Sequence, residues 1–325
     1  MKNTVLFIIL VIFLTALLPY FAVRYFCENY GIKKNSDTVT VYIKAENKTE
    51  KMNLNQYLKE VVAAEMPAEF NEEALKAQAV AARTYLVNRI RKYEKSGIPE
   101  EHHGAYICTD CTHCKAWIRE KERKELWGEE NSDKYWKKIS DAVDDTNGLI
   151  ITYNGEPIEA VFHSTSSGYT ENAADVWGGN VDYLVSVKSE GDENSPKYSS
   201  EKTFTIDEFK AVAQNHIADV NWDSSIIGNI VRSDAGGIKT IEIGGKTVKG
   251  SDFRFMYGLQ STNAYITTDD KNVIISVKGY GHGVGMSQYG ADYLAGEGKG
   301  FEEILKTYYS GVEFEKVNSI YYTAK

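Results

Sequence analysis

An uncharged, mostly apolar stretch near the start of the chain constrains everything that follows it. Residues 5–23 (VLFIILVIFLTALLPYFAV) include no charged side chain. A helix of this length would reach about 28 Å, roughly the thickness of the hydrocarbon layer of a bilayer. A cleaved signal peptide is the second interpretation, but the stretch is long for one and no small-residue cleavage site follows. We expect a transmembrane anchor at 1–24, a linker at 25–37 and a folded part at 38–325.

The charge pattern excludes one class of partner but does not orient the anchor. The formal net charge is −9, which argues against nucleic acid, because phosphate binding depends on clustered Lys and Arg. Lys2 precedes the anchor, whereas Arg24, Lys33 and Lys34 follow it, and this count alone would keep the folded part inside the cell. Bulky residues precede Cys27, where a lipidated bacterial cysteine needs small ones, so we expect Cys27 to be unmodified.

Periodicity beyond residue 38 predicts one α+β unit, in which grouped helices stand apart from a mainly antiparallel sheet. Helical spacing predicts a first helix that ends at Met66-Pro67 and a second that runs from a cap at Asn71 to about Tyr93. Further helices are predicted at 133–146, 286–295 and 301–308. Alternating patterns predict strands at 38–43, 149–153, 158–163, 226–232, 238–243, 264–267 and 272–278, with a polar insertion at 189–202. The pattern leaves open how this part is subdivided.

Glu65 stands where an apolar residue is expected. With Leu54, Leu58 and Val61 it lines one stripe of the first predicted helix, at the C-terminal end. The helix dipole and the apolar neighbours both disfavour the charged carboxylate, and both therefore favour the raised pKa that a general acid needs. The alternative is a partly buried glutamate that reaches solvent or pairs with Arg83. The pattern alone does not separate the two.

Several segments resemble the stage II sporulation protein D family of lytic transglycosylases. They are YLKEVVAAEMP at 57–67, EALKAQAVAARTY at 73–85, FHSTSSGYT at 162–170 and GYGHGVGMSQYGA at 279–291. The resemblance implies that Glu65 is the catalytic acid/base and that the folded part lies outside the cytoplasm, between mother cell and forespore. Glu65 would protonate the oxygen between N-acetylmuramic acid and N-acetylglucosamine, and then deprotonate the muramic 6-hydroxyl so that a 1,6-anhydro ring closes.

The reaction implied by the resemblance needs only one carboxylate, whereas most glycosidases use two. Glu171 and Asp175 are weak candidates for a second one. Two other classes of function stay open: a non-catalytic glycan-binding scaffold of the engulfment machinery, and a zinc hydrolase in which Glu65 has no chemical role.

Two loops contribute most of the candidate substrate-binding residues. The hydroxyl-rich segment 162–170 suits sugar recognition, although a Ser/Thr turn that bonds to its own backbone has the same composition. The glycine-dense segment 279–290 could bring backbone amides close to a ligand, but it lacks the signatures of a phosphate loop and of a serine hydrolase. Including the family segment at 73–85, the expected substrate-binding residues are Gln78, Arg83, His163, Ser164, Ser166, Ser167, Tyr169, His282, Ser287 and Gln288.

A dense group of potential metal ligands lies within residues 102–114, namely His102, His103, Cys108, Cys111, His113 and Cys114. Zinc needs four ligands. Disulfide pairing is the alternative outside the cytoplasm, but it would leave a cysteine unpaired and the histidines unexplained. Members of the family resemble this segment as CTDSTHC, with serine where Cys111 stands. We therefore expect structural zinc on His102, Cys108, His113 and Cys114, with Cys111 in reserve.

The resemblance also implies the partners. These are the glycan strands of peptidoglycan, a sporulation amidase that removes stem peptides, and a multispanning membrane protein of the same machinery. The sequence itself indicates no surface for either protein.

Overall fold

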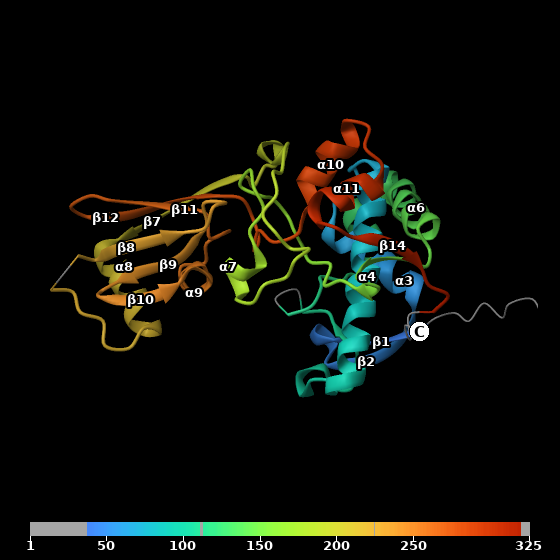
Figure 1. Ribbon diagram of the computed structural model, residues 1–325, viewed down its shortest axis with the longest axis horizontal. Helices are drawn as coiled ribbons and strands as arrows, with labels where there is room; N and C mark the ends of the chain where they lie inside the picture. Colours follow the sequence, from blue (N-terminus) through green and yellow to red (C-terminus); the bar gives the residue numbers. More distant parts are fainter. Residues whose placement is uncertain (1–37, 111–112, 224, 320–325) are drawn as a thin grey trace, which may run out of the picture.

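The computed structural model describes residues 38–110, 113–223 and 225–319, and these pack around two separate hydrophobic cores. We call residues 38–198 and 279–319 the helical lobe, and residues 199–278, on the left in Figure 1, the inserted lobe. The chain enters and leaves the inserted lobe at one place, where the Gly279 N–H donates to the Tyr198 carbonyl at 2.7 Å. Periodicity predicts a single unit and does not locate this division.

The predicted anchor and linker lie outside the described residues. None of the helices in the described part of the chain combines the length and the apolar character that a membrane crossing needs.

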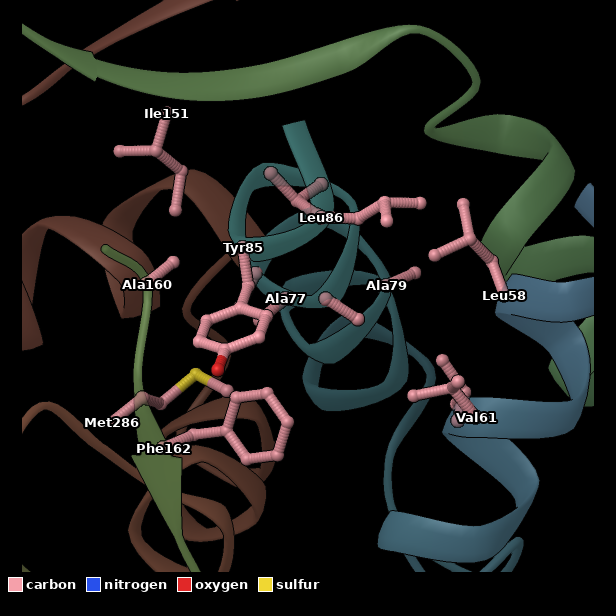
Figure 2. Packing of buried hydrophobic residues seen from close by; sticks show 14 of the residues in the cluster. Leu58, Val61, Ala77, Ala79, Tyr85, Leu86, Ile151, Ala160, Phe162 and Met286 are labelled. Carbon is pink, nitrogen blue, oxygen red and sulfur yellow. The ribbon is translucent and has the colours of Figure 1, made fainter. Parts of the chain in front are cut away.

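The central helix of the helical lobe is α4 (Glu72–Ser96), which is buried along most of its length. Figure 2 shows Leu58 and Val61 of α3 (Leu54–Glu65) on one side of α4, and Phe162 and Met286 on the other. Small residues such as Ala79 let the neighbouring elements approach α4 closely. Further helices of this lobe are α5 (Glu120–Trp127), α6 (Glu129–Asp145), α7 (Ala173–Trp177), α10 (Gln288–Gly296) and α11 (Phe301–Tyr308), with short 3-10 helices at η2 (Lys44–Glu46), η3 (Glu100–His102) and η4 (Asp192–Asn194).

The C-terminal end of α3 lies where the sequence predicts it, and its N-terminal cap is Asn53. The side chain of Asn53 accepts a hydrogen bond from the Gln56 N–H at 3.1 Å, and Met66 is extended because it precedes Pro67. At α4 the predicted cap is wrong in one respect. Asn71 occupies the cap position, but its side chain donates to Asp292 of α10 instead of accepting from the helix.

The described strands form five small sheets, whereas the sequence predicts one mainly antiparallel sheet. In the helical lobe, β1 (Thr38–Ile43) pairs antiparallel with β2 (Lys48–Asn53) and parallel with β3 (Ile107–Cys108). A second sheet has the order β14 (Glu313–Lys316), β4 (Leu149–Tyr153), β5 (Glu156–Pro157). The third pairs β6 (Phe162–His163) parallel with β13 (Met286–Ser287), with His163 opposite Ser287, and so joins the two loops that were predicted to bind sugar.

The inserted lobe consists of two antiparallel three-stranded sheets and two helices. One sheet has the order β11 (Ala264–Thr268), β12 (Asn272–Lys278), β7 (Ser199–Thr205), and the other has the order β10 (Lys246–Lys249), β9 (Ile238–Ile243), β8 (Ile227–Arg232). The helices are α8 (Ile206–His216) and α9 (Gly250–Met256).

Several predicted boundaries need correction. The helix predicted at 133–146 begins at Glu129, and the strand predicted at 158–163 forms only over its last two residues. The helix predicted from Met286 begins two residues later, after β13. The predicted polar insertion at 189–202 includes η4 and the start of β7.

Arg83 is a structural residue and not the substrate ligand that the sequence predicts. Its side chain is fully buried, and its guanidinium donates to the carbonyls of Val143, Thr146 and Leu149. These carbonyls belong to the end of α6 and the start of β4, where helix carbonyls lack partners within the helix. Burial lowers the pKa of Arg83 to about 10. Arg83 therefore fastens the α6–β4 junction and is not the partner of Glu65.

We expect Arg83→Ala to lower the free energy of unfolding by about 3–5 kcal/mol, because it leaves buried carbonyls without donors. Arg83→Lys keeps a cation but loses the planar fork, so its stability should lie between those of Arg83→Ala and the natural protein. Urea denaturation followed by circular dichroism measures all three. Equal stabilities would show that the junction does not depend on these hydrogen bonds.

Candidate functional site

Glu65, at the end of α3, is partly buried and held from two sides. Its Oε1 accepts a hydrogen bond from the Ala116 N–H at 2.9 Å, and the side chain of Gln288 also bonds to the carboxylate. Burial raises the pKa of Glu65, while the Lys115 ammonium, the Ala116 N–H and Gln288 act in the opposite direction. The raised pKa has the direction expected from the sequence. The sequence did not indicate that a cation, Lys115, would lie near Glu65.

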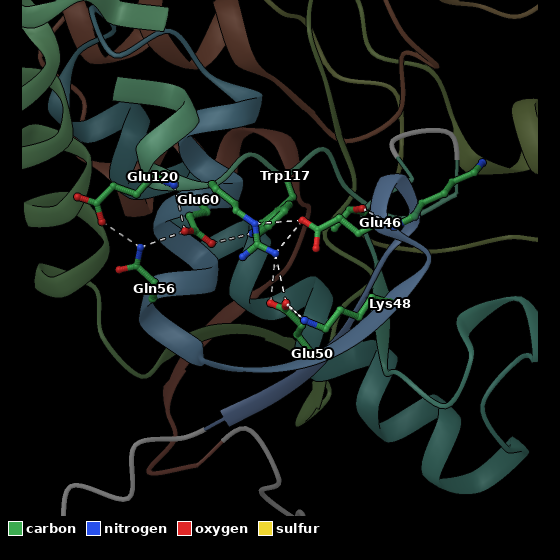
Figure 3. A network of polar contacts seen from close by, with 10 residues as sticks. Glu46, Lys48, Glu50, Gln56, Glu60, Trp117 and Glu120 are labelled. Atoms are coloured by element: carbon green, nitrogen blue, oxygen red, sulfur yellow. Dashed lines mark hydrogen bonds and ion pairs between the residues drawn. The ribbon is translucent and has the colours of Figure 1, made fainter. Parts of the chain in front are cut away.

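Glu60, earlier on α3, is also buried but has a different role. It accepts hydrogen bonds from Gln56 Nε2 at 3.1 Å, Trp117 Nε1 at 2.9 Å and the Glu120 N–H at 3.1 Å (Figure 3). Three donors satisfy this carboxylate, so it serves as an anchor for the chain. The segment 115–120 thus lies along α3, tied at Glu60 and again at Glu65.

Lys115 is a site residue that the sequence analysis missed. Its side chain is buried, and its ammonium lies 3.6 Å from the centre of the Phe162 ring and 4.2 Å from that of Tyr85. Burial lowers the pKa of Lys115 to about 8, and the charge of Glu65 opposes this effect. Lys115 follows a metal-ligand candidate and precedes three apolar residues, so its local sequence gives no indication of a site residue. Only the fold brings it to Glu65.

Two predicted substrate-binding residues, His163 and His282, lie close together, and Trp177 packs against His282. The ring centroids of His163 and His282 are 5.7 Å apart, and those of His282 and Trp177 are 5.1 Å apart. His163 Nδ1 lies 3.2 Å from the Val284 carbonyl, which can only accept, so Nδ1 carries the proton. The buried Nε2 of His163 has no hydrogen-bond partner among the described residues.

Both histidines are neutral at neutral pH. Burial lowers the pKa of His163 to about 4. It also lowers the pKa of His282 well below its ordinary value, helped by the nearby positive charges of Lys115 and Arg254. A neutral His163 presents the lone pair of Nε2 as a hydrogen-bond acceptor.

Trp177, at the end of α7, is the second residue that the sequence analysis missed. About half of this residue is exposed, although tryptophan is usually largely buried in folded proteins. Tyr169, which was predicted to bind substrate, is exposed to the same degree. Flat aromatic faces that stay in contact with water beside polar groups suit the apolar face of a sugar ring.

Two of the predicted substrate-binding serines are structural. Ser166 and Ser287 are buried, and both donate to the buried carboxylate of Asp192, Ser166 through its backbone N–H and Ser287 through its hydroxyl. Ser287 also caps α10, because its hydroxyl accepts from the Gly290 N–H at 3.2 Å. Asp192 lies in the segment that was predicted to be a polar insertion, and it locks the 162–170 loop to α10.

Of the other residues predicted to bind substrate, two serines are accessible to a ligand and one glutamine is buried. Ser164 and Ser167 are partly exposed, and Ser167 accepts a hydrogen bond from Asn263 of the inserted lobe at 2.9 Å. Gln78 is fully buried behind Gln288, with Gln288 Nε2 lying 3.4 Å from Gln78 Oε1. Gln78 can therefore act on a ligand only through Gln288.

Close packing requires glycine at two positions of the 279–290 loop. Gly279, Gly281 and Gly283 also line a recess beside His282, so the approach of this backbone to a ligand stays a prediction. A Cβ at Gly281 would lie 2.7 Å from the Cβ of His163, and one at Gly285 would lie 2.2 Å from the Val161 carbonyl oxygen. Both residues also have positive φ, at 118° and 72°. Glycine is required because this loop presses against the segment 161–163.

Neither weak candidate for a second carboxylate is available. Glu171 is buried and accepts from the Gly237 N–H at 3.1 Å, and Asp175 pairs with Lys239 at 2.5 Å. Both partners belong to the inserted lobe. These two acids therefore connect the lobes.

The four residues selected from the sequence as metal ligands converge. The ligand atoms of His102, Cys108, His113 and Cys114 all lie within 4.8 Å of one another. His102 Nε2 is 3.1 Å from His113 Nδ1 and 3.4 Å from Cys114 Sγ, separations that fit the edges of a tetrahedron with metal bonds of about 2.0–2.3 Å. Neither Cys108 nor Cys114 is in a disulfide. Cys111 lies outside the described residues.

The surroundings of the cluster also suit a metal. His102 Nδ1 is 3.1 Å from the Ala105 carbonyl, which holds the proton on Nδ1 and leaves Nε2 free to bind. Cys114 immediately precedes Lys115, whose charge acts on Glu65, and Ala116, whose N–H donates to it. The cluster therefore lies at one end of the segment that positions the candidate acid.

We expect Lys115→Met to raise the pKa of Glu65 further. The substitution roughly keeps the volume but removes the ammonium that favours the charged carboxylate, so the carboxyl should stay protonated to higher pH. A ¹³C NMR titration, with the resonance assigned from Glu65→Gln, measures the pKa directly. Lys124→Met on α5 is the control and should leave it unchanged. A fall in the pKa, or no change, would contradict the proposed electrostatic contact.

Comparison with known proteins finds relatives that match most of this chain. A family model described as SpoIID, Stage II sporulation protein, matches residues 42–153. Stage II sporulation protein D of Bacillus subtilis (strain 168) is 41% identical over 289 residues, 89% of this chain and 82% of its own length, and that of Bacillus amyloliquefaciens is 39% identical over 89% and 81%. The amidase enhancer of Bacillus subtilis (strain 168) is 29% identical over 78% of this chain and 39% of its own length. The chain therefore belongs to the stage II sporulation protein D family.

Proposed function

We propose that the protein is a peptidoglycan lytic transglycosylase that cleaves N-acetylmuramic acid–N-acetylglucosamine bonds during forespore engulfment. It would act on glycan strands that have lost their stem peptides and leave 1,6-anhydro-muramic ends. The observation that carries the proposal is the state of Glu65, a partly buried carboxyl whose pKa is raised by burial while the Lys115 ammonium, the Ala116 N–H and Gln288 support its anion. This combination supports a lyase with one general acid/base.

In the first step, protonated Glu65 donates its proton to the glycosidic oxygen, which leaves with the electron pair of the bond to the anomeric carbon of muramic acid. Glu65 is then an anion, and the Lys115 ammonium stabilises this form between the two steps. In the second step, the carboxylate takes the proton of the muramic 6-hydroxyl, whose oxygen bonds to the anomeric carbon. The proton on Glu65 is thereby restored and no water is consumed.

Residues of the 162–170 and 279–290 loops, together with Trp177, would hold the substrate. Trp177 and Tyr169 offer faces for sugar rings, and the unpartnered Nε2 of His163 can accept a hydrogen bond from a sugar hydroxyl. Gln288 contacts Glu65 itself and so suits a position next to the bond that breaks.

Glu65→Gln should reduce cleavage of purified glycan strands about 10²–10⁴-fold while strand binding is retained, because only the proton donor is lost. Mass spectrometry of the released fragments should find anhydro-muramic ends, one water lighter than hydrolysed ends. Glu69→Gln, an exposed carboxylate just beyond α3, is the matched control and should cleave normally.

The same experiment separates the competing functions. Full activity in Glu65→Gln would refute the proposal and favour a zinc hydrolase. Strand binding without any product from the natural protein would favour a non-catalytic scaffold. If the natural protein releases only fragments with hydrolysed ends, Glu65 can still be the general acid, but the protein is a hydrolase and no 1,6-anhydro ring closes.

We propose further that His102, Cys108, His113 and Cys114 hold a structural zinc ion. Two imidazole nitrogens and two thiolates form a donor set that zinc favours, and four protein ligands fill its coordination shell. The ion would supply a cross-link between η3, β3 and the start of the segment 113–120. The residues of that segment would then place Lys115 and Ala116 at Glu65.

Metal analysis should find about one zinc ion per chain, as a single four-ligand site requires. Cys114→Ser should lose the zinc and melt at a lower temperature, whereas Cys111→Ser, the control at the reserve position, should retain it. Chelation should reduce cleavage only as fast as the protein loses stability. An instant loss of cleavage at an unchanged melting temperature would instead indicate a catalytic metal.

For localisation and partners we propose a single-pass membrane protein whose folded part lies outside the cytoplasm. The similar protein named amidase enhancer supports an amidase as a partner, in keeping with a strand from which peptides must first be removed. A multispanning membrane protein of the engulfment machinery is the second proposed partner.

A further inference from the structure

The β11-β12-β7 sheet of the inserted lobe has one face that does not serve its core. Val273, Ile275 and Val277 of β12 are buried in the smaller core, whereas Ser276 and Lys278 alternate with them and are exposed. Ser276 is opposite Tyr265 of β11 and opposite Glu201 of β7. The outer face is therefore polar, with one exposed aromatic ring among charged and hydroxyl groups.

This outer face is hollowed, and one of its residues also lines a recess beside His282. A depression of about 380 Å³ is lined by Ser199, Ser200, Glu201, Tyr265, Ser276 and Lys278. A second, smaller recess is lined by Ser167, Tyr169 and His282 of the helical lobe and by Asn263 and Lys278 of the inserted lobe. The second recess holds only about 10 Å³, so a chain-like ligand would lie across it and not inside it, and Lys278 is the residue that lines both hollows.

The chemistry of this face suits a polymer of amino sugars. Half of the Tyr265 side chain is exposed, and the Arg232 guanidinium lies 4.7 Å from the centre of its ring and holds it in place. Glu201 accepts from the Ser276 hydroxyl at 3.1 Å, so its charge is partly engaged within the sheet. The ammonium of Lys278 is exposed, at the junction of the two hollows.

We propose that this face is a distal binding surface for the glycan strand, beyond the sugars that lie at Glu65. Tyr265 stacks on a sugar ring, and Lys278 pairs with the lactyl carboxylate that muramic acid exposes when its stem peptide has been removed. The inference rests on the proposed function, and it adds the part of the strand that the inserted lobe recognises. It also gives the inserted lobe a role, since its separate core contributes nothing to the surroundings of Glu65.

Binding by the full-length protein in detergent tests the proposal, in the Glu65→Gln background so that strands stay intact. The probes are labelled, peptide-free glycan strands of long and tetrasaccharide length, together with long oligomers of N-acetylglucosamine, which lack the carboxylate. We expect Tyr265→Ala to raise the Kd for long strands about tenfold and Tyr265→Phe to bind like the parent. We expect the tetrasaccharide to occupy the positions at Glu65 and to show no such difference.

Lys278→Gln should raise the Kd for long muramic-acid strands by a factor of about three to ten and leave that for the N-acetylglucosamine oligomers unchanged. Lys246→Gln on β10, an exposed lysine away from both hollows, is the matched control and should change neither Kd. Circular dichroism melting curves establish that the variants are folded.

The inference is overturned if Tyr265→Ala and Lys278→Gln bind long strands like the parent. It is also overturned if Lys278→Gln raises the Kd for muramic-acid strands and that for N-acetylglucosamine oligomers by the same factor. Tighter binding of strands that keep their stem peptides would also overturn it, because a peptide amide replaces the free carboxylate. Fragment analysis of the natural protein decides the proposed function independently, so the failure of one is distinguishable from the failure of the other.

Discussion

The site depends on one hydrogen-bonded contact, between the carboxylate at the end of α3 and the backbone of the segment that follows the His/Cys cluster. A carboxyl group at a helix C-terminus, among apolar side chains, is disfavoured as an anion. Here the Ala116 N–H and the Lys115 ammonium return part of that lost stabilisation. The group is therefore neither forced to remain neutral nor free to ionise as in water, which is the balance that a group acting first as acid and then as base requires.

Two glutamates of α3 illustrate how surroundings decide the role of a carboxylate. Glu60 and Glu65 are both buried to some degree, and burial raises the pKa of each. Glu60 is surrounded by three donors and holds the neighbouring segment in place. Glu65 has the Ala116 N–H and Gln288 as hydrogen-bond partners and the Lys115 ammonium as a nearby charge. Glu60 thus fixes the segment whose residues act on the carboxyl group of Glu65.

Much of the site was predictable from the sequence, but not all for the right reason. The four metal-ligand candidates lie close along the chain, so a short loop can bring them together, and they do converge. The glycines of the 279–290 loop were conspicuous, yet two of them serve close packing against the 161–163 segment. Arg83, Ser166 and Ser287 belong to matching family segments, and the fold uses all three for internal hydrogen bonds. A motif marks residues that matter without saying which of them face a ligand.

The sequence by itself determined the position of Glu65 on an apolar stripe, the stop of α3 at Met66-Pro67 and the gathering of His and Cys residues within 102–114. Each of these follows from residues near one another in the chain, where helical spacing, proline geometry and loop length act directly. Only the tertiary structure decided that Lys115 and Trp177 belong to the site, that Asp192 is buried, and that residues 199–278 form a second core. Those outcomes depend on contacts between segments that are distant in the chain. The free energy of such contacts depends on which surfaces pack together in the fold, and no local sequence pattern records that.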